Sequence, residues 1–86
     1  MGEHDLVEII EGALLAAAEP LSKRELAQLF DELDRPSTAD ITTALTAVAE
    51  RCEGRGFELV EVASGFRYQV RQHLSPWVSK LWVERP

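Results

Sequence analysis

The feature that most constrains the fold is a pair of short strands late in the chain, FELVEVASGFRYQVR at residues 57–71. Phe66, Tyr68 and Val70 alternate with polar residues, as in a strand that buries one face. Ser64-Gly65 is the expected turn, because glycine accepts the positive φ of tight hairpins. The first strand mixes apolar and polar residues on both faces, so the sequence leaves open which face is buried.

Three helices are predicted before this hairpin. The first covers residues 4–20, with Asp5 as its cap and Pro20 at its end. Most of its apolar residues repeat at helical spacing: Leu6, Val7, Ile9, Ile10, Ala13, Leu14 and Ala17. Leu15 falls instead on the polar side of this helix, which carries Glu8 and Glu11.

The second and third helices are marked by caps. Ser22 forms a capping box with Glu25, and the helix that follows turns three apolar residues toward the core: Leu26, Leu29 and Phe30. Pro36 ends that helix. The third helix covers residues 38–53, capped by Ser37 or Thr38, and buries one stripe: Ile41, Leu45, Val48 and Cys52, with Ala44 and Ala49 at its edges.

A short last helix is predicted from Ser75 as N-cap and Pro76 at the first helical position. Its apolar stripe consists of Trp77, Val78, Leu81 and Trp82. Three helices, two strands and a helix are the order of the winged-helix domain, an α+β fold with a helix-turn-helix core and a hairpin wing. The 86 residues suffice for one domain, so residues 1–86 are predicted to form a single winged-helix domain.

The charge opposes DNA binding, although many winged-helix domains bind DNA. The chain carries 15 acidic against nine basic residues, a net charge of −6. The exposed face of the third helix, which reads bases in DNA-binding relatives of this fold, is neutral to acidic: Asp40, Thr43, Thr46, Ala47 and Glu50. The wing tip carries no charge. We therefore expect no direct nucleic-acid contact, with a winged-helix transcription regulator as the alternative function.

No catalytic residue, metal or cofactor is expected, and no small-molecule substrate. Cys52 lies on the apolar stripe of the third helix and is interpreted as a buried structural thiol. His4 and His73 do not join a cluster with zinc-ligand spacing. The single cysteine excludes an internal disulfide and favours a reducing, cytoplasmic setting. No apolar run approaches the ~20 residues that a membrane span needs.

Two stretches resemble the bacterial segregation and condensation protein B family, ScpB. Residues 10–22, IEGALLAAAEPLS, are similar to the EALLFAAGEPLS-like opening of the family, with Ala16 where a larger apolar residue is usual. Residues 52–63, CEGRGFELVEVA, look like its GRGFELVEVAGGYRL-like segment, and SGFRY continues the match. PWV at residues 76–78 precedes the last helix, and the resemblance covers residues 6–82.

The resemblance implies a non-catalytic accessory subunit of the SMC–kleisin complex that condenses and segregates bacterial chromosomes. Such proteins form homodimers and bind the kleisin ScpA, which bridges the heads of the SMC ATPase. They are cytoplasmic and reach the nucleoid through the complex. Family members usually carry a second winged-helix domain, so the chain is expected to be the N-terminal half of a longer two-domain protein.

Five residues are candidates for an interface: Leu15, Ala16, Trp77, Leu81 and Trp82. Leu15 is apolar on a polar helix face, and tryptophan is enriched in protein interfaces. For Leu15 the alternative is an ordinary exposed apolar residue. For Trp77 the alternative is core packing, which the sequence favours.

Overall fold

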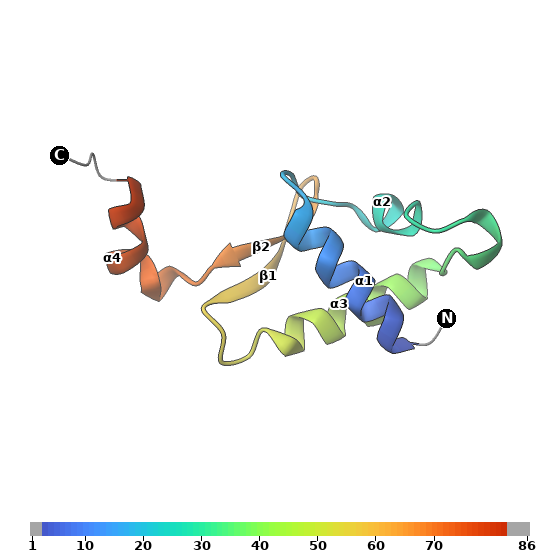
Figure 1. Ribbon diagram of the computed structural model, residues 1–86, viewed down its shortest axis with the longest axis horizontal. Coiled ribbons are helices and arrows are strands. Elements are labelled where there is room, and N and C mark those ends of the chain that lie inside the picture. The colour runs from blue at the N-terminus through green and yellow to red at the C-terminus, as the bar shows by residue number, and fades with distance from the viewer. Residues whose placement is uncertain (1–2, 83–86) are drawn as a thin grey trace.

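The computed structural model describes residues 3–82, with side chains from residue 5. Its elements follow the predicted order (Figure 1): α1 (Glu3–Ala16), α2 (Lys23–Ala27), η1 (Glu32–Asp34), α3 (Thr38–Arg51), β1 (Phe57–Val62), β2 (Gly65–Val70), η2 (Gln72–Leu74), α4 (Ser75–Val78) and η3 (Ser79–Trp82). Within residues 3–82, no helix is long and apolar enough to span a membrane.

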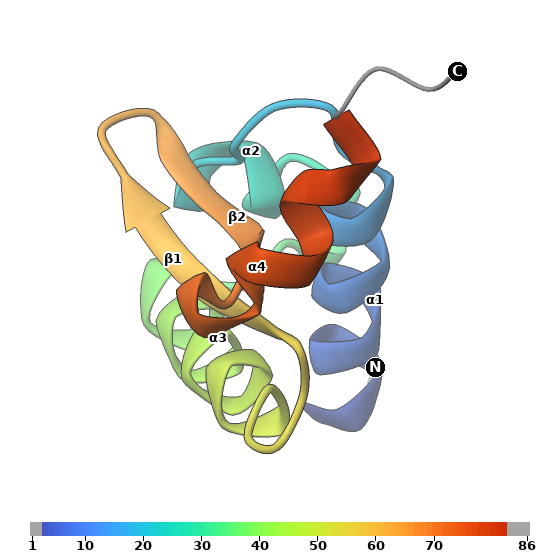
Figure 2. The ribbon, with the colours of Figure 1, turned by 90° about the vertical axis from the view of Figure 1, so that its left-hand side faces the viewer.

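The core lies where α1, α2 and α3 meet the hairpin. β2 lies next to α1, and β1 lies next to α3 (Figure 2). The most deeply buried large side chains come from all three helices: Ile10, Leu26, Ile41 and Val48. Full burial of each such side chain contributes roughly 1.5–3 kcal/mol. The predicted stripes of α1 and α3 therefore hold the domain together.

The first helix begins and ends earlier than predicted. Asp5 was predicted to cap it, but α1 begins at Glu3 and Asp5 lies in its first turn. The helix ends at Ala16, four positions before Pro20. The Ala17 N–H still bonds to the Ala13 carbonyl at 2.9 Å, so the last turn extends slightly into the connection to α2.

The capping boxes of α2 and α3 form as the sequence predicts. The Ser22 hydroxyl accepts the Glu25 N–H at 3.0 Å, and the Glu25 carboxylate accepts the Ser22 N–H at 3.0 Å. The second bond holds the pKa of Glu25 below its ordinary value. Ser37 rather than Thr38 caps α3, and its partner is Asp40.

Two apolar residues of the helices do not lie where the sequence placed them. Leu29 is 54% exposed, so its predicted burial is wrong. Because α2 ends at Ala27, Leu29 lies beyond the helix and leaves the stripe that Leu26 begins. On α3, Ala47 was assigned to the exposed face but packs partly against the core. Ala49, assigned to the edge of the buried stripe, is exposed.

The strand register settles which face of the hairpin is buried. β1 and β2 are antiparallel, with Leu59 opposite Tyr68 and Glu61 opposite Phe66. Leu59, Tyr68 and Phe66 pack against the core, so this face points inward. Val62 pairs with Gly65, which leaves residues 63–64 as the turn. The prediction of a Ser64-Gly65 turn is therefore wrong by one position.

A close backbone contact, and not the turn, requires glycine at position 65. The segment before α2 pairs with the start of β2: the Leu21 N–H donates to the Phe66 carbonyl at 2.9 Å, and the Phe66 N–H donates to the Leu21 carbonyl at 2.8 Å. Gly65 has a φ of +143° and lies against the backbone of Leu21 and Ser22. This bridge fixes the hairpin to the helical core.

Candidate functional site

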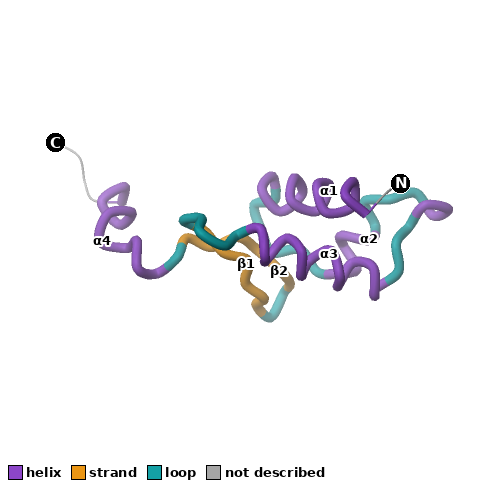
Figure 3. The backbone as a smooth tube through the Cα atoms, turned by 90° about the horizontal axis from the view of Figure 1, so that it is seen from below, coloured by secondary structure: helices purple, strands orange, loops and turns teal. Residues whose placement is uncertain are grey.

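The C-terminal arm, residues 72–82, projects away from the rest of the molecule. It comprises η2, α4 and η3, and Figures 1 and 3 both show α4 separated from α1 and α3 along the long axis. The described residues measure 54 × 23 × 21 Å, with a radius of gyration of 15.0 Å. A compact chain of this length has a radius of gyration of about 12 Å. The arm accounts for the elongated shape.

The arm exposes the apolar residues that were candidates for an interface. Trp77 is 66% exposed, Leu81 is 58% exposed and Trp82 is 81% exposed. The alternative of core packing for Trp77 is therefore wrong, because the arm lies away from the core. Ser75 was predicted as the N-cap, but it is the first residue of α4 and Leu74 occupies the cap position. Aromatic side chains this exposed are unusual in an isolated domain.

Arg71 holds the base of the arm. Its guanidinium donates to the carbonyl oxygens of Cys52 and Arg55, both at 2.9 Å. It also lies 3.7 Å from the Glu58 carboxylate, and its backbone N–H donates to the Gly56 carbonyl at 3.0 Å. The end of α3, the start of β1 and the residue just before the arm are thus tied together. The alternation of polar residues along residues 66–71 gave no sign of this role of Arg71.

Replacing Arg71 with lysine is expected to destabilise the chain by about 1–3 kcal/mol. A single ammonium group cannot reproduce the fork that reaches both carbonyls. Urea unfolding would measure the loss, with Arg67→Lys as the control, because Arg67 is exposed and bonds only at 3.4 Å to Gln69 in the described chain. Equal stabilities of the two variants would contradict this role of Arg71.

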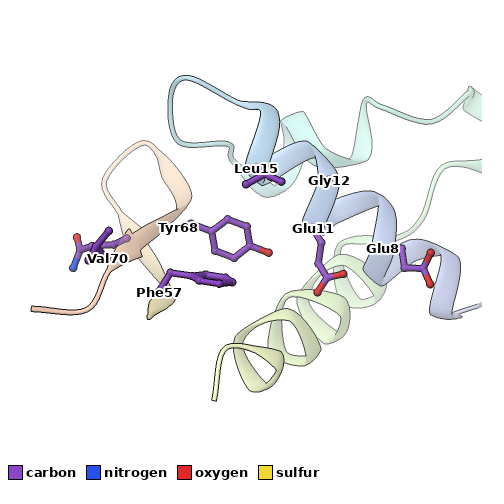
Figure 4. Close-up of a pocket in the computed structure, with 8 residues that line it drawn as sticks. Glu8, Glu11, Gly12, Leu15, Phe57, Tyr68 and Val70 are labelled. Carbon is purple, nitrogen blue, oxygen red and sulfur yellow. The ribbon is translucent and has the colours of Figure 1, made fainter. Parts of the chain in front are cut away.

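A groove lies between α1 and the open end of the hairpin (Figure 4). Its volume is about 620 Å³, and it is lined mainly by apolar surface. Phe57 and Tyr68 form one wall, with their rings edge to face at a centroid distance of 5.1 Å. The α1 side of the groove consists of Glu8, Glu11, Gly12 and Leu15, and Gln69 and Val70 complete the lining.

Leu15 is one of the residues that line this groove. Leu15 is 80% exposed, as its position on the polar side of the helix predicted. It faces the hairpin across the groove. Ala16 is also exposed but does not line the groove. Sequence reasoning missed Phe57 and Val70, which are 40% and 47% exposed. The alternation of the strand residues could have found Val70, since Tyr68 and Val70 share a face.

Cys52, the thiol considered for catalysis, does not line this groove, and the side chain of His4 lies outside the described residues. Cys52 is buried, and desolvation raises the pKa of its thiol. Its Sγ donates to the Val48 carbonyl at 3.4 Å. Within the part of the chain that the structure describes, no three His, Cys, Asp or Glu side chains form a group that could hold a metal ion.

The surface of α3 offers few groups for reading bases. The Thr46 hydroxyl donates to the Thr42 carbonyl of its own helix at 3.1 Å. The Asp40 carboxylate accepts the Ser37 N–H in the capping box. Arg51, at the end of the helix, forms an ion pair with Glu11 at 2.8 Å. Two of the polar residues that the sequence singled out on this face, Asp40 and Thr46, are thus engaged within the chain.

Comparison with known proteins identifies the family. Residues 8–86 match the family model of the segregation and condensation complex subunit ScpB. The chain belongs to the ScpB family. It is 46% identical over 78 residues to the segregation and condensation protein B homolog of Coxiella burnetii, an alignment that covers 91% of this chain and 37% of that protein. The protein B of Syntrophotalea carbinolica is 37% identical over 82 residues, which cover 95% of this chain and 41% of that protein.

Solved structures of the family share the fold. ScpB from Mycobacterium tuberculosis superposes with a TM-score of 0.80 at 24% identity, covering 95% of this chain and 50% of that one. A structure described as a dimer of the ScpB N-terminal domain complexed with ScpA peptide superposes with a TM-score of 0.78 at 26% identity. That alignment covers 91% of this chain and 95% of the other. The predicted α+β winged-helix class is confirmed, and the chain spans about two fifths of the length of the curated ScpB relatives.

Proposed function

We propose that this ScpB-family chain is a non-catalytic accessory subunit of the bacterial SMC–kleisin complex, which forms a homodimer and binds the kleisin ScpA. The proposal rests on the match to a ScpB N-terminal domain that is described as a dimer with ScpA peptide, since nearly the whole of each chain is aligned. Its site of action is the cytoplasm, where it joins the nucleoid through the complex and contributes to chromosome condensation and segregation.

The exposed apolar residues support a role in protein interaction. Large exposed apolar patches mark interaction sites, and the arm and the groove each offer an apolar surface. We assign the homodimer interface to the residues that the sequence singled out: Leu15, Ala16, Trp77, Leu81 and Trp82. The acidic chain and the engaged polar groups of α3 argue against DNA as the main partner.

The test combines self-association with binding of the two candidate partners. Sedimentation equilibrium is expected to show a dimer, and calorimetry is expected to show saturable binding of ScpA from the same organism. Leu15→Asp and Trp82→Asp should each weaken self-association, whereas Leu33→Asp should not, because Leu33 is 99% exposed on η1 and lies away from both surfaces.

Three results would count against the proposal. A monomer that does not bind ScpA would overturn the assigned function. Unchanged self-association of both Asp variants, with the fold preserved, would show that the interface is assigned to the wrong faces. Micromolar, salt-dependent binding to short duplex DNA would favour a transcription regulator instead.

A further inference from the structure

The chain presents two apolar surfaces that do not meet. One is the C-terminal arm with Trp77, Leu81 and Trp82, and the other is the groove between α1 and the hairpin. Figures 1 and 3 show α4 well separated from α1, at the far end of the molecule. We infer that the arm of one copy docks in the groove of a second copy, and that the exchange is reciprocal. This inference rests on the proposed homodimer and specifies how its interface is built.

The base of the arm directs it away from its own groove. Arg71 is bonded to the Cys52 and Arg55 carbonyls. The Leu74 side chain lies so close to Gly56 that a Cβ at Gly56 would be 3.1 Å from Leu74 Cδ1. These contacts fix the first turn of the arm against the loop between α3 and β1. With its base fixed in this way, the arm leaves the hairpin in a direction away from α1 (Figure 1).

Charge also favours the groove as the site for the arm. Residues 1–70 carry fourteen acidic side chains against six basic ones, whereas residues 71–82 carry Arg71 and Lys80 and no acidic residue. Glu8 and Glu11 line the groove. Glu11 is already paired with Arg51, so Glu8 is the acidic group best placed to attract Lys80. The same chain therefore carries both the acidic groove and a basic arm that complements it.

The exchange would hide enough surface for a stable dimer. Two indoles and a leucine at the observed exposures offer on the order of 450 Å² per arm. Reciprocal docking covers both arms and a similar area on and around both grooves, roughly 1,800 Å² in total, which lies within the ~1,200–2,000 Å² of stable interfaces. In a dimer with twofold symmetry, the second arm–groove contact is identical to the first.

Two variants test the arm and the groove separately. The arm variant carries Trp77→Asp and Trp82→Asp, which remove the only tryptophans of the chain. The groove variant carries Gly12→Arg, which places a long side chain on the groove floor. A Cβ at Gly12 would meet no atom within 4 Å, and replacing a glycine inside a helix favours the helix. Each variant should therefore fold but bind its own copies at least about thirtyfold more weakly than wild type does.

Mixing the two variants gives the decisive measurement. The arm of the groove variant can enter the intact groove of the arm variant, so one of the two junctions should form in the mixture. The heterodimer should therefore be weaker than the wild-type dimer but detectable, although each variant alone is monomeric. All tryptophan fluorescence comes from the groove variant, and its emission should shift to shorter wavelength as the tryptophan-free arm variant is added. Circular dichroism of each variant alone confirms that both are folded.

The outcomes distinguish this inference from the proposed function. If wild type is a dimer but the mixture gives no heterodimer and no shift, the exchange is overturned while the homodimer stands. If wild type is a monomer whose tryptophans are already buried, the arm occupies its own groove. If wild type is a monomer with exposed tryptophans, the proposed homodimer fails, and with it the exchange. A shift that appears only on addition of ScpA peptide would assign the arm to the kleisin and also overturn the exchange.

Discussion

Gly65→Ala is expected to destabilise the chain by roughly 2–6 kcal/mol, from about 1–3 for backbone strain and about 1–3 for overpacking. The added Cβ would overlap the Leu21 carbonyl and lie 2.6 Å from Ser22 N, at a φ of +143°. The obstacle is backbone, which cannot rotate away as a side chain would. The Leu21–Phe66 bridge would have to open, and the Ser22 cap of α2 would shift with it.

Two other glycines provide matched controls for this substitution. Gly54 has a φ of +74° but open space around it, so Gly54→Ala should cost only the strain, about 1–2 kcal/mol. Gly12→Ala, in the interior of α1 with no atom within 4 Å, should stabilise the chain by about 0.5–1 kcal/mol. Urea unfolding of the three variants would rank them. A Gly65→Ala variant no less stable than Gly54→Ala would contradict the close approach to Leu21.

Gly65 also illustrates a contact that could not be predicted from the sequence. The Ser22–Glu25 box was predictable because both partners lie within one turn. Gly65 was assigned to a turn because glycine after serine is a common hairpin signal. Its actual constraint comes from Leu21, a residue far away in sequence. Local signals therefore predicted the elements, and the contact between distant segments had to come from the structure.

The candidate site likewise has parts that the sequence predicts and parts that it does not. Leu15 could be predicted as exposed, because its position on the helix wheel is fixed by α1 alone. The groove beside it could not be predicted, since it depends on the register of the hairpin and on its packing against α1. The exposure of Trp77 was missed for a related reason: an apolar stripe on a short helix is the same pattern whether the helix covers a core or projects from it.

The second large loss of stability that we expect comes from replacing the buried leucine of α2, Leu26. Leu26→Ala should destabilise the chain by about 2–5 kcal/mol, because Leu26 is fully buried between the helices and its removal leaves a cavity. A chain of this length has a total stability of about 4–13 kcal/mol. The variant should therefore be partly unfolded under mild conditions.

Leu29→Ala is the matched control, three residues away and chemically identical. Leu29 is 54% exposed, so its loss should change the unfolding free energy by less than about 1 kcal/mol. Both variants should be compared by urea unfolding at one chain concentration below the dissociation constant of the dimer, because self-association adds to apparent stability. Similar losses for the two would mean that Leu29 is buried, as the helical periodicity alone suggested. A large loss at Leu26 only would show that Leu29 lies outside the core.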